Sequence, residues 1–144
     1  MTNTDLDSRL ESWLNLRKQI DQSLDPFNDV IDFWNKVNLT AHNHLIDHYY
    51  SASWPTPWEI IETNRYDDFT KAIMIGYTLL LTEKYKNSDI QIRTLLDKQH
   101  NKLYNVVYVD DLYVLNFCDN GAISPDEIPE SCCTENLIVL ARPR

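Results

Sequence analysis

The amino-acid sequence predicts a single α+β domain over residues 1–144, in which N-terminal helices precede a long helix packed on a small antiparallel sheet. A chain of 144 residues has the usual size of one domain. Apolar residues recur at helical spacing up to about residue 85, and the period then changes to the two-residue alternation of strands. Helices that precede a group of strands, rather than alternating with them, are typical of the α+β class.

Three main helices are expected in the first half of the chain. Residues 1–24 form an amphipathic N-terminal segment, which either docks on a partner or packs on the protein's own sheet. Asp25 followed by Pro26 predicts the N-cap and the first residue of a second helix. The longest helix is expected over residues 67–85, with Asp67 near its positive end.

Four strands are expected in the second half of the chain. They cover residues 90–96, 103–109, 112–117 and 137–141. Only Asp110 and Asp111 separate the second strand from the third, which is the spacing of a β-hairpin. If these two residues form the turn, Asn105 faces Asn116 on the same side of the sheet.

Composition and charge exclude several classes of protein. The net charge of -9 repels phosphate backbones, so nucleic acid is not expected as a partner. With only two glycines, the chain cannot contain a P-loop, a dinucleotide fingerprint or a G-x-S-x-G elbow, and no cofactor is expected. No apolar stretch is long enough to span a membrane or to serve as a secretory signal, which predicts an intracellular protein.

Two kinds of reactive site remain as alternatives. His42, His44 and His48 are spaced so that they could bind a metal, although surface or capping histidines are the simpler interpretation. Cys118 or Cys133 could serve as the nucleophile of a cysteine hydrolase or acyltransferase together with a histidine. Three clustered cysteines do not form a disulfide framework, and a structural role is the simpler interpretation for each.

Aromatic residues supply the candidate binding surface. Trp54 and Trp58 flank two prolines, which favours a rigid surface feature. Leu10 and Trp13 lie on the apolar face of the amphipathic N-terminal helix. We therefore expect these four side chains to contact other proteins.

The order of motifs between residues 54 and 117 resembles the transglutaminase-like branch of the papain-like fold. The run Trp-Pro-Thr-Pro-Trp-Glu over residues 54–59 comes first, Tyr-Asp-Asp-Phe over residues 66–69 then opens the long helix, and antiparallel strands follow. In that family a cysteine at the helix start is the nucleophile, a histidine on a strand is the base, and an Asp or Asn on the next strand orients it. The resemblance places Tyr66, Asn105 and Asn116 at these three positions.

These substitutions predict that the protein is not an enzyme. A tyrosine hydroxyl has a reference pKa near 10, and an amide cannot accept its proton. The resemblance thus implies a catalytically degenerate scaffold that acts as a structural or interaction protein. It extends to small proteins of tailed bacteriophages, which implies a virion or assembly component, located in the host cytoplasm or the virion, whose partners are other proteins.

Overall fold

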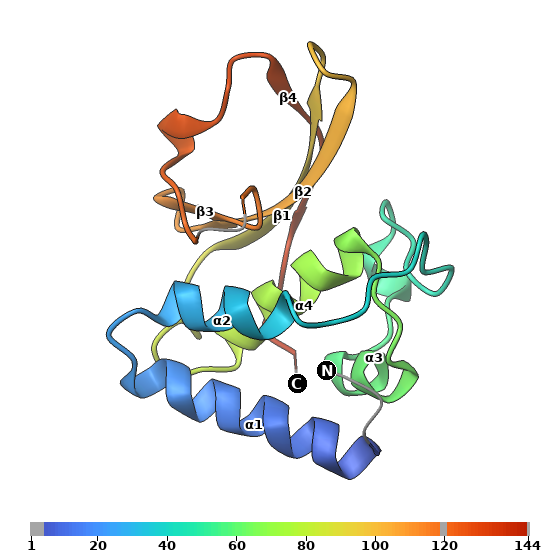
Figure 1. Cartoon of the computed structure of the whole chain (residues 1–144), viewed down its shortest axis with the longest axis vertical. Coiled ribbons are helices and arrows are strands. Elements are labelled where there is room, and N and C mark those ends of the chain that lie inside the picture. The colour runs from blue at the N-terminus through green and yellow to red at the C-terminus, as the bar shows by residue number, and fades with distance from the viewer. Residues whose placement is uncertain (1–4, 119–120, 144) are drawn as a thin grey trace.

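The computed structural model describes residues 5–118 and 121–143, and it confirms the predicted α+β class (Figure 1). Residues 1–4 of the predicted N-terminal segment lie outside the described residues. The helices are α1 (Leu6–Gln22), α2 (Pro26–Trp34), α3 (Pro57–Thr63) and α4 (Asp68–Leu80), with short 3-10 turns η1 (Ser51–Ser53) and η2 (Pro125–Glu127). The strands are β1 (Ile90–Asp97), β2 (Lys102–Val109), β3 (Tyr113–Leu115) and β4 (Cys132–Val139).

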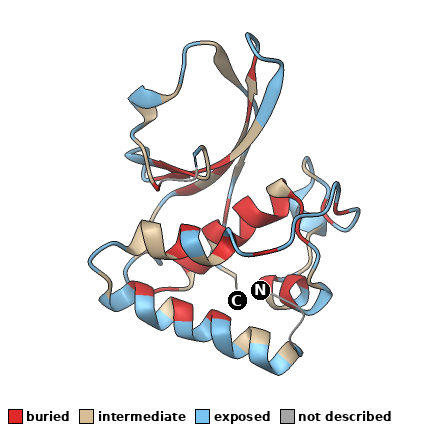
Figure 2. Ribbon diagram, viewed as in Figure 1, coloured by how far each residue is buried: buried red, intermediate tan, exposed pale blue. Residues whose placement is uncertain are grey.

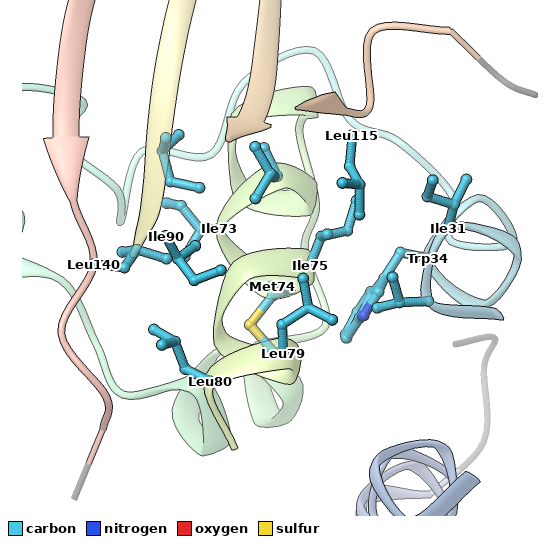
Figure 3. Packing of buried hydrophobic residues seen from close by; sticks show 14 of the residues in the cluster. Ile31, Trp34, Ile73, Met74, Ile75, Leu79, Leu80, Ile90, Leu115 and Leu140 are labelled. Atoms are coloured by element: carbon cyan, nitrogen blue, oxygen red, sulfur yellow. The ribbon is translucent and has the colours of Figure 1, made fainter. Parts of the chain in front are cut away.

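Helix α4 forms the centre of the hydrophobic core, because almost all of its side chains are buried. One side of α4 packs on β1 and β2, and another side packs on α2 and α1 (Figure 1). The close-up in Figure 3 shows α4 between Trp34 of α2 and Ile90 of β1. The start of α4 is therefore held between the helical layer and the sheet.

Helix α1 places its apolar face on the protein's own core. Trp13, Leu16 and Ile20 are buried there, and the remaining face of α1 is mostly exposed (Figure 2). Asp5 caps the helix by accepting a hydrogen bond from the backbone N–H of Ser8 at 2.8 Å. Among the described residues, no helix has the length and apolar character needed to cross a membrane.

The single glycine of α4 allows the helix to approach the sheet closely. A Cβ atom at Gly76 would lie 2.6 Å from Cδ1 of Leu140 and 3.1 Å from Cγ2 of Ile90. Both distances are shorter than ordinary van der Waals contact, so a side chain at this position would force the ends of the Leu140 and Ile90 side chains to shift.

The four strands form one antiparallel sheet in the order β3-β2-β1-β4, and both of its faces are covered. Residues such as Ile92 and Val107 belong to the same buried cluster as α4. Residues such as Val106 and Tyr108 form a second cluster, which is covered by partly buried side chains from residues 117–132. Two-sided burial explains why β2 is almost continuously apolar rather than strictly alternating.

Several element boundaries differ from the sequence-based prediction, and two of them differ most. The long helix ends at Leu80 rather than near residue 85, because the Thr82 hydroxyl donates to the backbone carbonyl of Leu79 at 2.6 Å and accepts from the backbone N–H of Tyr85. The last strand begins at Cys132 rather than at residue 137. The first half of this strand lacks an apolar alternation, so the sequence pattern did not predict it. These residues form a strand because they pair with β1.

The hairpin pairs in a register one residue away from the prediction. Val109 pairs with Tyr113 rather than with Leu112, so the connection contains three residues instead of two. Asp110 and Asp111 both have positive φ, at 54° and 55°, and Leu112 donates from its backbone N–H to the carbonyl of Val109. A shift of one residue reverses which face each side chain occupies, so the predicted direct pairing of the two asparagines is wrong.

Candidate functional site

The start of α4 contains a network of buried and half-buried hydrogen bonds. Asp67 is the N-cap of α4, and its Oδ1 accepts from the backbone N–H and the hydroxyl of Thr70 at 2.8 and 2.6 Å. Its Oδ2 accepts from the backbone N–H of Asn43 at 3.0 Å. Burial raises the pKa of Asp67, but the hydrogen bonds from Thr70 and Asn43 outweigh it and lower the pKa overall. A buried carboxylate anion therefore lies at the positive end of the helix.

The sheet contacts the start of α4 through Asn105 rather than through the predicted trio. The side-chain amide of Asn105 donates to Asp68 Oδ2 at 3.0 Å, and its oxygen accepts from the Thr94 hydroxyl at 3.0 Å. Asn116 donates from Nδ2 to the backbone carbonyl of Asn105 at 2.7 Å. The two asparagines are thus close together, as expected, despite the shifted register. The sequence did not predict Asp68 as the hydrogen-bond partner of Asn105. Its place in the Tyr-Asp-Asp-Phe run, at the start of the long helix, was the signal that could have identified it.

Tyr66 lies in the hydrophobic core and not in a surface cleft. Its side chain is 1% exposed, and its ring packs against Trp34 with a centroid separation of 5.5 Å. Burial raises the pKa of its hydroxyl, which has no hydrogen-bond partner among the described residues. The Tyr66 hydroxyl thus makes no hydrogen bond to Asn105 or Asn116, and the three predicted positions are not joined in one hydrogen-bonded cluster.

A cluster of two histidines and one carboxylate forms on the other side of Asp67. One ring nitrogen each of His42 and His48 and one oxygen of Asp67 lie within 4.8 Å of one another. The ring of His48 stacks on Phe69 at 3.8 Å, and burial lowers its pKa, which favours the neutral imidazole. His44 contacts the ring of His42 at 4.7 Å between centroids but is not part of this cluster.

A groove next to the loop before α3 contains one of the predicted binding residues. We call it the Trp54 groove; it has a volume of about 520 Å³ and is lined by Leu45, Ser53, Trp54, Pro55, Glu59, Glu62 and Thr63. The Trp54 indole N–H donates to the backbone carbonyl of Asp47 at 2.6 Å, and its ring meets Phe69 edge-on. These contacts fix the orientation of the ring that forms one wall.

The other three predicted binding residues are located away from this groove. Trp13 is fully buried, and Trp58 packs edge-on against it at 5.8 Å. Leu10 is half-buried against the same core. Of the four residues expected to contact partners, Trp54 is the one that lines the Trp54 groove.

The two candidate nucleophilic thiols contact oxygen atoms. The Cys118 thiol donates to the backbone carbonyl of Gly121 at 3.9 Å, and the Cys133 thiol donates to the Glu135 carboxylate at 3.6 Å. Both donate to oxygen acceptors in these contacts, so neither contact pairs a thiol with an imidazole.

The arrangement of the described residues, with the start of a buried helix against an antiparallel sheet, matches the transglutaminase-like fold of a solved structure. Among solved structures, the chain is similar to LapG of Legionella pneumophila. The EGTA-treated form has 18% sequence identity and a TM-score of 0.69, over 92% of this chain and 73% of that chain. The calcium-bound form has 17% identity and a TM-score of 0.65, over 99% and 84%. No family model matches the sequence, and no curated protein matches it.

This comparison corrects the prediction that the protein is not an enzyme. LapG is a cysteine protease, so the fold is one that supports catalysis. The replacements at Tyr66, Asn105 and Asn116 do not show that activity has been lost, and nothing in the comparisons indicates a phage origin. At this level of identity the likeness establishes the fold alone.

Proposed function

We propose that the protein binds a basic segment of another polypeptide in the Trp54 groove. The observation that carries the proposal is the chemistry of the lining, which combines two carboxylates, Glu59 and Glu62, with the ring of Trp54 and the exposed side chain of Leu45. The backbone and hydroxyl of Thr56 hydrogen-bond to Glu59 and lower its pKa, which keeps this carboxylate charged. A lysine or arginine can pair with the carboxylates and lie over the indole ring.

The charge of the whole molecule supports the same class of partner. The net charge of -9 attracts a basic partner from a distance and raises the rate of encounter. The preset orientation of Trp54 reduces the entropy lost on binding. The resemblance drawn from the sequence implies a phage virion or assembly component, so a subunit of a virion or of an assembly intermediate is the first source in which to look for such a segment.

The experiment measures fluorescence anisotropy of a short labelled peptide of lysine and leucine residues. We expect salt-sensitive binding that weakens about tenfold in the double variant Glu59→Gln/Glu62→Gln, since each exposed ion pair contributes up to about 1 kcal/mol. Glutamine at position 59 retains the capping interaction with Thr56. The matched control, Glu83→Gln/Glu130→Gln, makes the same change in net charge away from the groove and should leave affinity within about twofold.

Two results would overturn the proposal. One is equal affinity for a peptide in which glutamate replaces lysine. The other is an equal loss of affinity in the groove variant and the control variant, which would assign the binding to the overall charge of the protein.

A further inference from the structure

We propose that His42, His48 and Asp67 form a binding site for a divalent transition metal, with Zn²⁺ as the first candidate. The donor atoms come from two segments that are far apart in sequence, the loop between α2 and α3 and the N-cap of α4 (Figure 1). His42 Nδ1 lies 3.8 Å from Asp67 Oδ2, and all three donor atoms lie within 4.8 Å of one another. Zinc bound tetrahedrally at about 2.0–2.2 Å separates its ligands by about 3.4 Å, so the cluster needs to contract by about an ångström.

His48 is held in place in a way that suits a ligand. Its ring stacks on Phe69 with an interplanar angle of 12°, and its backbone carbonyl accepts from the side-chain amide of Asn136 on β4 at 2.8 Å. Its Nε2 atom is buried and has no hydrogen-bond partner among the described residues. A buried nitrogen with no partner is rare in folded proteins, and a bound cation would satisfy it.

Asp67 supplies the negative charge that such a cation requires. Thr70 occupies Oδ1 of Asp67 with two hydrogen bonds, while in the described part of the chain Oδ2 accepts one hydrogen bond, from the backbone N–H of Asn43. A carboxylate oxygen has two lone pairs, so Oδ2 retains one lone pair that the backbone N–H of Asn43 does not use. The hydrogen bonds also fix the carboxylate in position, which is the usual arrangement around a metal ligand.

The chemistry of the donors selects the type of metal. Two imidazoles and one carboxylate suit zinc and similar transition metals, whereas calcium takes six to eight oxygen ligands. Asp67 alone contributes a carboxylate to this cluster, so it does not fit calcium. The site proposed here is therefore not a calcium site, although one LapG structure contains calcium.

The site is open on one side. A pocket of about 400 Å³ adjoins it, lined by His42, His44, Ile46, Asp47, His48 and Tyr49, and the side chain of His42 is 53% exposed. Three protein ligands with an accessible remaining position are typical of sites at which a metal binds water or an external group, whereas structural zinc sites are closed by four protein ligands.

Isothermal titration with ZnCl₂ tests the proposal on the full chain after removal of metals by a chelator. The background protein carries serine at positions 118, 132 and 133, because free thiols also bind zinc. We expect one zinc ion per chain. His42→Ala, His48→Phe and Asp67→Asn should each weaken binding at least about tenfold, as expected when a ligand is lost. Phenylalanine retains the stacking on Phe69, and asparagine remains a good N-cap.

Two control variants separate this site from adventitious histidine binding. His44→Ala removes a neighbouring imidazole, and His100→Ala removes the histidine of the other His–Asp pair, which lies 2.9 Å from Asp97. Both should bind zinc within about threefold of the background protein. Thermal unfolding without metal checks that each variant is folded, and the visible spectrum of the Co²⁺ complex reports the coordination directly.

Three outcomes would overturn the proposal. The first is no zinc binding by the folded background protein at micromolar concentrations. The second is binding that His44→Ala or His100→Ala weakens as much as His48→Phe does. The third is a Co²⁺ spectrum that is unchanged in folded Asp67→Asn.

Discussion

Thr78 is a polar residue in the apolar part of α4, and its side chain accepts hydrogen bonds inside the core. Its hydroxyl oxygen accepts hydrogen bonds from the indole N–H groups of Trp13 and Trp34 at 2.9 and 3.1 Å. Both tryptophans are fully buried, so neither indole N–H can donate a hydrogen bond to solvent water instead. One hydroxyl therefore satisfies two donors and fixes α1 and α2 against α4.

Replacing Thr78 with valine, which has nearly the same shape, should destabilise the protein by about 2–4 kcal/mol. The reason is that two buried indole N–H groups each lose their acceptor at a cost of about 1–3 kcal/mol. The free energy of unfolding in urea measures this effect. Thr63→Val on the exposed side of α3 is the control and should change stability by less than about 0.5 kcal/mol. A similar small change for both variants would show that the indoles find other acceptors.

Tyr66 should make the stability of the protein sensitive to alkaline pH. Burial raises the pKa of its hydroxyl in the folded state, whereas the unfolded chain loses this proton near pH 10. The unfolded state is thus favoured as pH rises above about 10, and stability falls there. Tyr66→Phe should reduce this loss and change stability at neutral pH by at most about 1 kcal/mol. The exposed replacement Tyr49→Phe should retain the alkaline slope of the unmodified protein, and an unchanged slope in Tyr66→Phe would contradict the assignment.

At the scale of elements, the turn between β2 and β3 explains the wrong register in the sequence-based prediction. Asp110 and Asp111 both occupy the left-handed region, which aspartate tolerates and glycine favours. Pairing then resumes at Tyr113 rather than at Leu112. Hydrophobic alternation alone does not distinguish the two registers here, because the apolar residues of both strands contribute to cores on the two faces of the sheet.

Asp111→Gly should stabilise the protein by up to about 0.5 kcal/mol, because glycine adopts a positive φ without steric cost, while loss of the ion pair between Asp111 and Arg93 at 3.4 Å offsets part of the gain. Asp110→Gly should gain less, since the Asp110 carboxylate accepts a hydrogen bond from the backbone N–H of Asp89 at 2.8 Å. Thermal unfolding of the two variants provides the comparison. An equal gain at both positions would show that the hydrogen bond between Asp110 and Asp89 contributes no more to stability than the ion pair between Asp111 and Arg93.

At the scale of the whole molecule, the fold class could be predicted from the sequence, but the candidate metal site could be predicted only in part: its two histidines were identified and its carboxylate was not. The change from helical to strand period identified the α+β class, and the Tyr-Asp-Asp-Phe run located the start of α4. His42 and His48 lie close to Asp67 because the loop between α2 and α3 packs against the start of α4. The conformation of this loop could not be predicted from a local sequence pattern. The histidine spacing suggested His44 as a ligand, whereas the structure brings a carboxylate in its place.

The reactivity of the cysteines tests the alternative that the protein is a cysteine hydrolase or acyltransferase. Burial and the nearby Asp97 carboxylate raise the pKa of Cys132, so its thiol should react more slowly with an alkylating reagent than the exposed Cys118. Mass spectrometry after brief labelling at mildly acidic pH measures each site. Rapid labelling of a single cysteine, blocked by an acyl substrate, would instead indicate a cysteine hydrolase.

We propose that the start of α4, together with the loop between α2 and α3 that packs over it, is the functional centre of the molecule. Anomalous X-ray diffraction from crystals grown with zinc tests this most directly. It should reveal one strong zinc peak at about 2.0–2.2 Å from the donor atoms of His42, His48 and Asp67. A peak at the cysteines of β4, or no peak beside Asp67 in well-ordered crystals, would contradict the account.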